Sequence, residues 1–172
     1  MVLVRRESPA DVDVIRAVTA AAFAKPGLDT PVEAPLVGWL RASPAWIAEL
    51  SLVAADLDGD VIGHVVCTRG TVEASPVLAL GPLSVRPDRQ RRGVGKALVH
   101  AVLGAAEALG EPLVALLGST GYYPRFGFRL ASEYGIMPGH PEWTPDFQVR
   151  ALTAYDPAVR GQFAYPEPFD RL

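Results

Sequence analysis

The chain has 172 residues, which is the usual size of one domain. Hydrophobic residues make up 49% and charged residues 20%, so the chain can bury a core and is not globally disordered. A net charge of −3 argues against a nucleic-acid binder driven by overall positive charge, and a single cysteine, Cys67, excludes an internal disulfide framework and argues against a zinc cage.

The first third of the chain predicts one strand followed by two helices. Residues 1–6 are short and apolar, as in a strand. Ser8-Pro9-Ala10-Asp11 combines a serine N-cap, a proline at the first helical position and an acid three residues after the cap, which predicts a helix that ends at Lys25-Pro26-Gly27. The same signal returns at Thr30-Pro31-Val32-Glu33, before an apolar stripe of Leu36, Val37 and Leu40.

The middle of the chain predicts strands. Two apolar runs, 51–56 and 61–68, flank an Asp58-Gly59 turn, which is a strong hairpin signal. A third run, 77–85, contains Gly81-Pro82, and because proline cannot donate to a ladder we expect a bulge or a local splay there.

The last part of the chain predicts an α/β crossover. Residues 93–109 form a helix that Gly110 stops, and 113–117 form a buried parallel strand. Residues 122–128 predict a helical turn that leads into a strand, and 147–152 predict the last strand. The tail, rich in proline and aromatic residues, is expected to wrap the surface. No linker is visible, so we expect one domain over 1–172, with a core of about 1–135 and a C-terminal strand and surface tail over 136–172.

The segment Val85–Ala97 joins a strand to a helix and is basic. It holds five basic residues and one acid in a chain that is acidic overall. Gly93 and Gly95 stand at the helix start, where the lack of side chains lets a ligand approach the backbone. Free N–H groups and the positive end of the helix dipole then face one point, which predicts a site for a phosphate or pyrophosphate.

Three phosphate-loop patterns compete for this segment, beside an ordinary basic loop. A Walker loop would need glycine in place of Gln90 and a hydroxyl in place of Ala97. A dinucleotide fingerprint would need glycine in place of Leu98. The pattern Q/R-x-x-G-x-G/A is matched at every fixed position by Gln90-Arg91-Arg92-Gly93-Val94-Gly95.

That pattern resembles the acetyl-CoA loop of the GCN5-related N-acetyltransferases. Tyr123-Pro124-Arg125-Phe126-Gly127-Phe128 looks like the tyrosine-x-x-x-glycine-phenylalanine segment that follows the fifth strand of these enzymes. Residues 80–85 and 117–128 look like the YhbS-like subfamily of predicted acetyltransferases. The resemblance covers nearly the whole chain and implies an α/β fold, with a mixed sheet of six or seven strands splayed between strands 4 and 5 and helices on both faces.

The resemblance also implies a set of site residues and acetyl-CoA as co-substrate, with no metal. Backbone amides and basic side chains of the loop would hold acetyl-CoA, and strand N–H groups would polarise its carbonyl. Tyr123 would protonate the CoA thiolate, because a phenol carries a proton at neutral pH, and its neighbour Tyr122 is the alternative. The predicted binding residues are Leu83, Ser84, Val85, Gln90, Arg91, Arg92, Gly93, Val94, Gly95, Lys96 and Ala97.

The base that deprotonates the amine is less well defined. Related sequences place an acid near Glu33, although a capping role after Thr30-Pro31 explains this residue equally well. Glu73 and Glu133 are alternatives that suit a solvated surface, and His64 suits a packed or hydrogen-bonded position in a strand. A relay through water would need no dedicated base. Cys67 suits a small buried hydrophobe, and the three histidines, at 64, 100 and 140, lack metal-ligand spacing.

We therefore expect an N-acetyltransferase that transfers acetyl directly to a primary amine in a ternary complex, since no Cys or Ser nucleophile with a basic partner is visible. The acceptor is an amine of a small molecule or a protein, and its pocket is expected within 30–41, 133–143 and the tail. A non-catalytic acyl-CoA-binding module is the alternative, which would not need Tyr123. We expect no nucleic-acid or membrane partner, no leader peptide and a cytoplasmic location, and leave a homodimer open.

Overall fold

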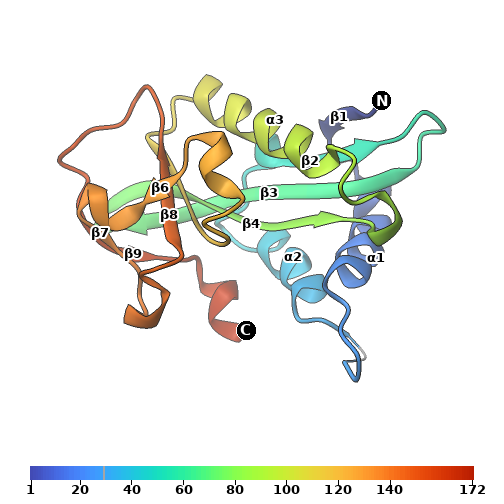
Figure 1. The fold of residues 1–172 in the computed structure, drawn as a ribbon, viewed down its shortest axis with the longest axis horizontal. Coiled ribbons are helices and arrows are strands. Elements are labelled where there is room, and N and C mark those ends of the chain that lie inside the picture. The colour runs from blue at the N-terminus through green and yellow to red at the C-terminus, as the bar shows by residue number, and fades with distance from the viewer. Residues whose placement is uncertain (29) are drawn as a thin grey trace.

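A computed structural model describes residues 1–28 and 30–172. A central mixed sheet separates α3 on one face from α1 and α2 on the other (Figure 1). The helices span Val12–Phe23 (α1), Glu33–Arg41 (α2) and Val94–Ala108 (α3). The strands span Leu3–Arg6 (β1), Ser51–Ala55 (β2), Val61–Val72 (β3), Ser75–Val85 (β4), Leu113–Leu117 (β5), Arg129–Leu130 (β6), Ile136–Met137 (β7), Phe147–Ala151 (β8) and Gly161–Ala164 (β9).

The main path of the sheet runs β1-β2-β3-β4-β5-β8-β6, and β9 pairs with both β3 and β7. β4 and β5 are parallel, and α3 connects them, as the crossover pattern predicted. The α/β fold with helices on both faces is confirmed. Among the described residues, no helix combines the length and the hydrophobicity that crossing a membrane requires.

The expected start of the first helix is confirmed, whereas that of the second is wrong. Ser8 and Asp11 form a capping box, in which the Ser8 backbone N–H donates to the Asp11 carboxylate at 2.7 Å, and a short 3-10 turn leads into α1. In α2 the N-cap is Val32 and no side chain caps the helix. Backbone bonds close the first turn instead, among them the N–H of Ala34 to the carbonyl of Pro31. Glu33 is therefore the first helical residue and serves no capping box.

The β2–β3 hairpin is confirmed, and so is the irregularity of β4. Cys67 of β3 pairs with Leu80 of β4, and Val65 pairs with Leu83. Between these pairs β4 contributes two residues, Gly81 and Pro82, opposite the single Val66. This is the geometry of a β-bulge.

The predicted splay between β4 and β5 begins beside this bulge. β4 and β5 pair only at Leu78–Val114 and Ala79–Ala115. Beyond these pairs β4 stays paired with β3 up to Val85, whereas β5 stays paired with β8 up to Leu117. The two strands therefore separate at the level of Leu80, and their unpaired edges face a common opening.

The C-terminal part departs from the expectation. The strand predicted over 147–152 is present as β8 but is not the last, because β9 follows and pairs through Phe163 with Val72 of β3. The described residues hold nine strands rather than six or seven. The three additional short strands, β6, β7 and β9, have two to four residues, too few for an alternating pattern to show. Phe163 is fully buried, so the tail contributes to the core as well as to the surface.

Buried side chains form separate clusters on the two faces of the sheet. Leu78 and Leu80 of β4, with Val114 and Leu116 of β5, face α3. The alternate residues point to the other face, among them Ala79 and Ala115, and join Phe147 and Phe163 in a second cluster. A third cluster packs Ile15 and Val37 of the first two helices against β2 and β3.

Candidate active site

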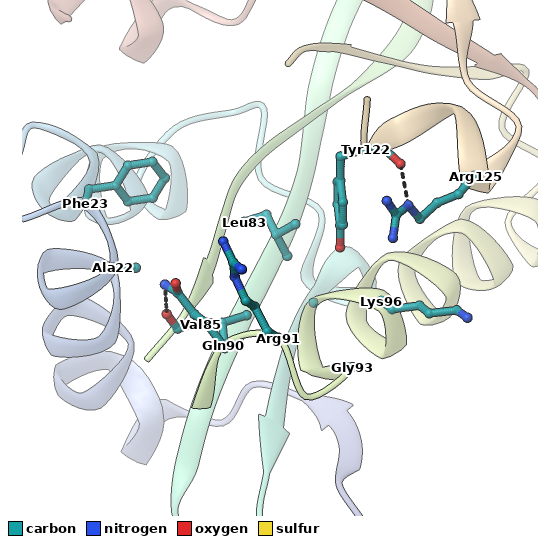
Figure 2. Close-up of a pocket in the computed structure, with 11 residues that line it drawn as sticks. Ala22, Phe23, Leu83, Val85, Gln90, Arg91, Gly93, Lys96, Tyr122 and Arg125 are labelled. Atoms are coloured by element: carbon teal, nitrogen blue, oxygen red, sulfur yellow. Dashed lines mark hydrogen bonds between the residues drawn. The ribbon is translucent and has the colours of Figure 1, made fainter. Parts of the chain in front are cut away.

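A groove of about 720 Å³ lies between the end of α1, the end of β4 and the start of α3 (Figure 2). It brings together most of the residues that the loop motif predicted to bind acetyl-CoA. Its lining consists of Ala22, Phe23, Leu83, Val85, Gln90, Arg91, Gly93, Gly95, Lys96, Tyr122 and Arg125.

The backbone at the start of α3 is shaped to present N–H groups. Gly93 is the N-cap and has a φ of 84°, a left-handed conformation that glycine adopts without strain. Arg91, two residues earlier, is also left-handed, with a φ of 59°. The N–H of Ala97 makes the first bond of the helix, to the carbonyl of Gly93 at 3.0 Å. The preceding N–H groups of the first turn thus lack helical acceptors and can bind an anion, whereas that of Ala97 is already used.

Acidic neighbours already compensate two of the five basic side chains in the loop. Arg86 lies 2.6 Å from the carboxylate of Asp88, and Arg89 lies 3.1 Å from that of Asp56. Arg91 and Lys96 line the groove, and neither forms an ion pair with another described residue. Arg125 also lines the groove and forms no ion pair with a described residue, so the positive charge available to a ligand there comes from these three side chains and the helix.

The remaining predicted loop residues have other positions. Gln90 donates its side-chain N–H to the carbonyl of Val85 at 3.0 Å, so it ties the loop to the end of β4 (Figure 2). Val94 is buried in the core below α3. Arg92 is exposed and does not line the groove.

The end of β4 presents backbone groups to the groove. Arg86 donates its N–H to the carbonyl of Ile62 on β3 at 2.8 Å, and successive residues of a strand turn their backbone groups to alternate sides. The backbone N–H of Ser84 therefore also points toward β3. The side-chain hydroxyl of Ser84 is buried and lies 3.4 Å from that of Thr19. Leu83 and Val85 direct their N–H groups toward the side where β5 has separated. These two groups can donate to a bound carbonyl.

Tyr122 reaches the groove from the turn after β5. Its ring points toward the start of α3 (Figure 2), and its hydroxyl lies 3.2 Å from the position that a Cβ atom would take on Gly95. Arg125 lies 4.6 Å above the same ring and donates to the Tyr122 carbonyl at 2.9 Å. A Cβ atom at position 95 would thus crowd this hydroxyl.

Tyr123 does not line this groove. Its ring packs against Gly118, where an added Cβ atom would come within 2.6 Å of the ring, and against the edge of Phe128. Burial raises the pKa of Tyr123 to about 12, so the phenol is protonated at neutral pH. The two adjacent tyrosines therefore occupy different places, Tyr122 in the groove and Tyr123 at the end of β5.

Of the candidate bases, His64 has the packed and hydrogen-bonded position that was expected. It is fully buried, its Nε2 atom lies 2.9 Å from the Ser51 hydroxyl, and the Glu7 carboxylate lies 3.7 Å away. Arg41 of α2 binds Glu7 through two hydrogen bonds of 2.9 Å. Burial lowers the pKa of His64 to about 4, so the imidazole is neutral.

The three candidate acids lie outside the groove. The Glu73 carboxylate accepts the backbone N–H of Gln162 at 2.8 Å and thereby holds β9 in place. Glu133 is exposed. Glu33 is half-buried at the start of α2, and its carboxylate makes no hydrogen bond or ion pair with another described residue.

Cys67 is buried in the core, as predicted, and burial raises the pKa of its thiol. Within residues 1–28 and 30–172, no three His, Cys, Asp or Glu side chains gather as metal ligands.

Sequence comparison identifies the family. The sequence model of the Acetyltransferase (GNAT) family matches residues 18–128. The chain belongs to this family. A curated relative, the uncharacterised N-acetyltransferase YhbS of Escherichia coli strain K12, is 32% identical over 175 residues, which cover 99% of both chains. The resemblance inferred from the motifs is thereby confirmed.

Two solved structures of GNAT proteins resemble the whole chain. One is the GNAT family N-acetyltransferase YhbS from Escherichia coli in complex with CoA, with a TM-score of 0.89 and 31% identity, covering 99% of this chain and 93% of that chain. The other is a GNAT family acetyltransferase from Brucella melitensis in complex with acetyl-CoA, with a TM-score of 0.81 and 34% identity, covering 99% of both chains.

Four groove residues were absent from the predicted site. Ala22 and Phe23 come from the end of α1, and nothing in the sequence links that helix end to the loop before α3. Tyr122 was considered only as the alternative to Tyr123. Arg125 lies inside the motif that ends at Phe128. Its positive charge, visible in the sequence, could have been used to predict contact with an anion.

Proposed function

We propose that this GNAT protein transfers the acetyl group of acetyl-CoA to a primary amine of a small molecule or a protein, by direct transfer in a ternary complex. The observation that carries this function is the groove. The free N–H groups of α3, the side chains of Arg91, Lys96 and Arg125 and the backbone edge of β4 all line this one groove. The complexes of the two similar proteins with CoA and acetyl-CoA support the same ligand.

The groove offers matched partners for each part of the ligand. The start of α3 suits the pyrophosphate, because N–H groups and the helix dipole both favour an anion there. The edge of β4 suits the amide-containing arm, since Leu83 and Val85 turn backbone groups toward it. One of these N–H groups would polarise the thioester carbonyl as negative charge develops on its oxygen.

Tyr123 is the proposed acid for the departing thiolate. It keeps its proton at neutral pH, because burial raises its pKa to about 12, and it lies at the end of β5, where β4 and β5 have separated. A phenol with this pKa is a weaker acid than the CoA thiol, whose pKa is near 8.5. Protonation of the thiolate by Tyr123 is therefore uphill, and it is completed when the nitrogen of the product gives its proton to the phenolate.

Glu33 is the proposed base that takes a proton from the incoming amine, directly or through water. It stands at the start of α2 and no capping interaction occupies its carboxylate. α2 contacts the C-terminal 3-10 turn Glu167–Arg171, within the regions expected to form the acceptor pocket.

The test is a screen for release of CoA thiol from acetyl-CoA in the presence of polyamines, amino acids, aminoglycosides and peptides. Acetyl-CoA and CoA should also raise the melting temperature by several degrees, since a ligand at about 100 times its Kd stabilises by roughly 2.7 kcal/mol. ATP and NADH should have much smaller effects. Stabilisation by CoA without thiol release above buffer would favour the alternative, a non-catalytic acyl-CoA-binding module. Stabilisation by ATP alone would contradict both.

A further inference from the structure

The first helix crosses the sheet and ends beside the open edge of β4. Ile15, Thr19 and Phe23 follow one another at intervals of four residues, so they lie on nearly the same face of α1. Ile15 belongs to the cluster that packs on β2 and β3. The Thr19 hydroxyl lies 3.4 Å from that of Ser84 on β4. One helical turn later, Phe23 lines the groove at the edge from which β5 has separated.

The ring of Phe23 has no packing role in the core. Its side chain is half-buried and belongs to none of the three buried clusters. Among the described residues, no other aromatic ring packs against it. The ring points from the end of α1 toward the side of Leu83 (Figure 2). A large apolar side chain in this position is suited to contact a ligand in the groove.

The two ends of the groove differ in chemical character. At the start of α3 the groove has free N–H groups, and most of its basic side chains come from the loop before α3 and from α3 itself. At the end of α1 it has only the apolar side chains of Ala22, Phe23 and Leu83. An acyl-CoA has the same division, since its phosphates are charged and its acyl group is apolar. The acyl group therefore suits the end of the groove that Phe23 lines.

The direction of β4 gives the same orientation. Val85 is the last residue of β4, and the loop to α3 follows it. Leu83 lies two residues, or about 7 Å, further from that loop. A ligand with its pyrophosphate at the start of α3 and its arm along β4 thus brings its thioester toward Leu83. Phe23 then stands beside the acyl group.

We propose that Phe23 is a specificity-determining residue that limits the acyl group of the donor to the size of acetyl. This role rests on the proposed function, because it requires acyl-CoA in the groove. The ring is the wall against which the acetyl methyl group packs, and a longer acyl chain has to displace it. Closely packed apolar sites tolerate added methylene groups poorly. Alanine at position 23 removes the wall and opens room for a longer chain.

The test compares kcat/KM for acetyl-, propionyl- and butyryl-CoA on the amine that gives the fastest thiol release in the screen. Each added methylene should lower kcat/KM of the wild type about tenfold. Phe23→Ala should raise the ratio of butyryl-CoA to acetyl-CoA activity by roughly tenfold or more over the wild-type ratio. Phe23→Leu, which keeps an apolar side chain of intermediate size, should give a ratio between the two.

Val14→Ala is the matched control. Val14 lies on the same helix but packs against the cluster on β2 and β3, outside the groove. This variant should keep the wild-type ratio. An equal change of the ratio in Val14→Ala and Phe23→Ala would assign the selectivity to the position of α1 and not to the ring, which would overturn the role of Phe23.

Two further results would overturn this role while leaving the proposed function in place. One is a wild type that uses butyryl-CoA at least as well as acetyl-CoA. The other is a Phe23→Ala ratio equal to that of the wild type, and a raised KM for the amine alone would then place Phe23 in the acceptor pocket. A wild-type protein that releases thiol from none of the three donors faster than buffer would instead overturn the proposed function, and the role of Phe23 with it.

Discussion

The carboxylate of Asp56, at the β2–β3 turn, lies 3.1 Å from the guanidinium of Arg89 in the loop before α3. The same carboxylate accepts the backbone N–H groups of Asp58 and Asp60, both at 3.0 Å. One side chain thus shapes the hairpin turn and holds the phosphate loop against it. The charge of Arg89 is compensated by Asp56, although the position of Arg89 in a basic loop suggests contact with a ligand.

This pairing predicts unequal roles for neighbouring arginines. Arg91→Ala should weaken CoA binding about tenfold, because its side chain lines the groove and its charge is uncompensated there. Arg89→Ala should change the Kd by less than about threefold, since Asp56 already neutralises that charge. Calorimetric titration with CoA at fixed salt measures both values. Equal losses would show that Arg89 also reaches the ligand.

The contact between Gly95 and Tyr122 predicts a rescue. Gly95→Ala should weaken CoA binding, because the new methyl group lies 3.2 Å from the Tyr122 hydroxyl and displaces it. Gly95→Ala in a Tyr122→Phe background should bind more tightly than Gly95→Ala alone, since the crowded oxygen is gone. Gly95→Glu should lose at least tenfold in affinity, or about 1.4 kcal/mol, in either background, because a carboxylate faces the pyrophosphate site. A Gly95→Glu protein that folds and binds normally would place the phosphate site elsewhere.

Substitutions of Tyr122 and Tyr123 should affect different kinetic constants. Tyr123→Phe is expected to lower kcat by about 10²-fold at unchanged KM for acetyl-CoA, the lower end of the usual contribution of a general acid. The lower end applies because a thiol with a pKa near 8.5 leaves fairly well without help. Tyr122→Phe should mainly raise the KM for acetyl-CoA, since Tyr122 lines the groove. Single-turnover and steady-state rates on one amine distinguish these outcomes, and a larger kcat loss at Tyr122 would reverse the assignment.

Buried His64 predicts how stability changes with pH. Its pKa is about 4 in the folded protein and about 6.5 in the unfolded chain, so the unfolded chain takes up a proton first as the pH falls. The free energy of unfolding should therefore fall by about 3 kcal/mol between pH 6.5 and pH 4. Below pH 4 the loss continues through Asp11, because hydrogen bonding to Arg5 lowers the pKa of that carboxyl to about 2.

Urea unfolding of the wild type and His64→Gln at several pH values tests this contribution. His64→Gln should have a flatter profile between pH 6.5 and pH 4, since glutamine does not titrate. Parallel profiles for the two proteins would assign the acid sensitivity to other groups.

Local signals predicted the cofactor loop and its helix well. Gly93 and Gly110 mark the two ends of α3 through their left-handed backbone conformation, and Gly81-Pro82 disturbs β4 for reasons intrinsic to proline. Such features depend on few distant contacts, and the GNAT motif contains most of them.

Other features depend on contacts between distant segments. Which tyrosine of the pair enters the groove is decided by packing between the end of β5 and the start of α3. β9 is too short to show a pattern, and its place comes from pairing with β3, some 90 residues earlier in the chain. The start of α2 at Glu33, with Val32 as the N-cap, shows that a Thr-Pro sequence can precede a helix without capping it.

The last turn of the chain packs on α2, and this governs how the protein can be prepared. The guanidinium of Arg171 lies 5.2 Å above the ring of Trp39, so a purification tag attached after Leu172 would begin beside α2, within the regions expected to form the acceptor pocket. The N-terminus lies at the opposite side of the sheet (Figure 1), next to the edge strand β1. A tag placed there leaves the α2 surface free, and acceptor screens should use that version of the protein.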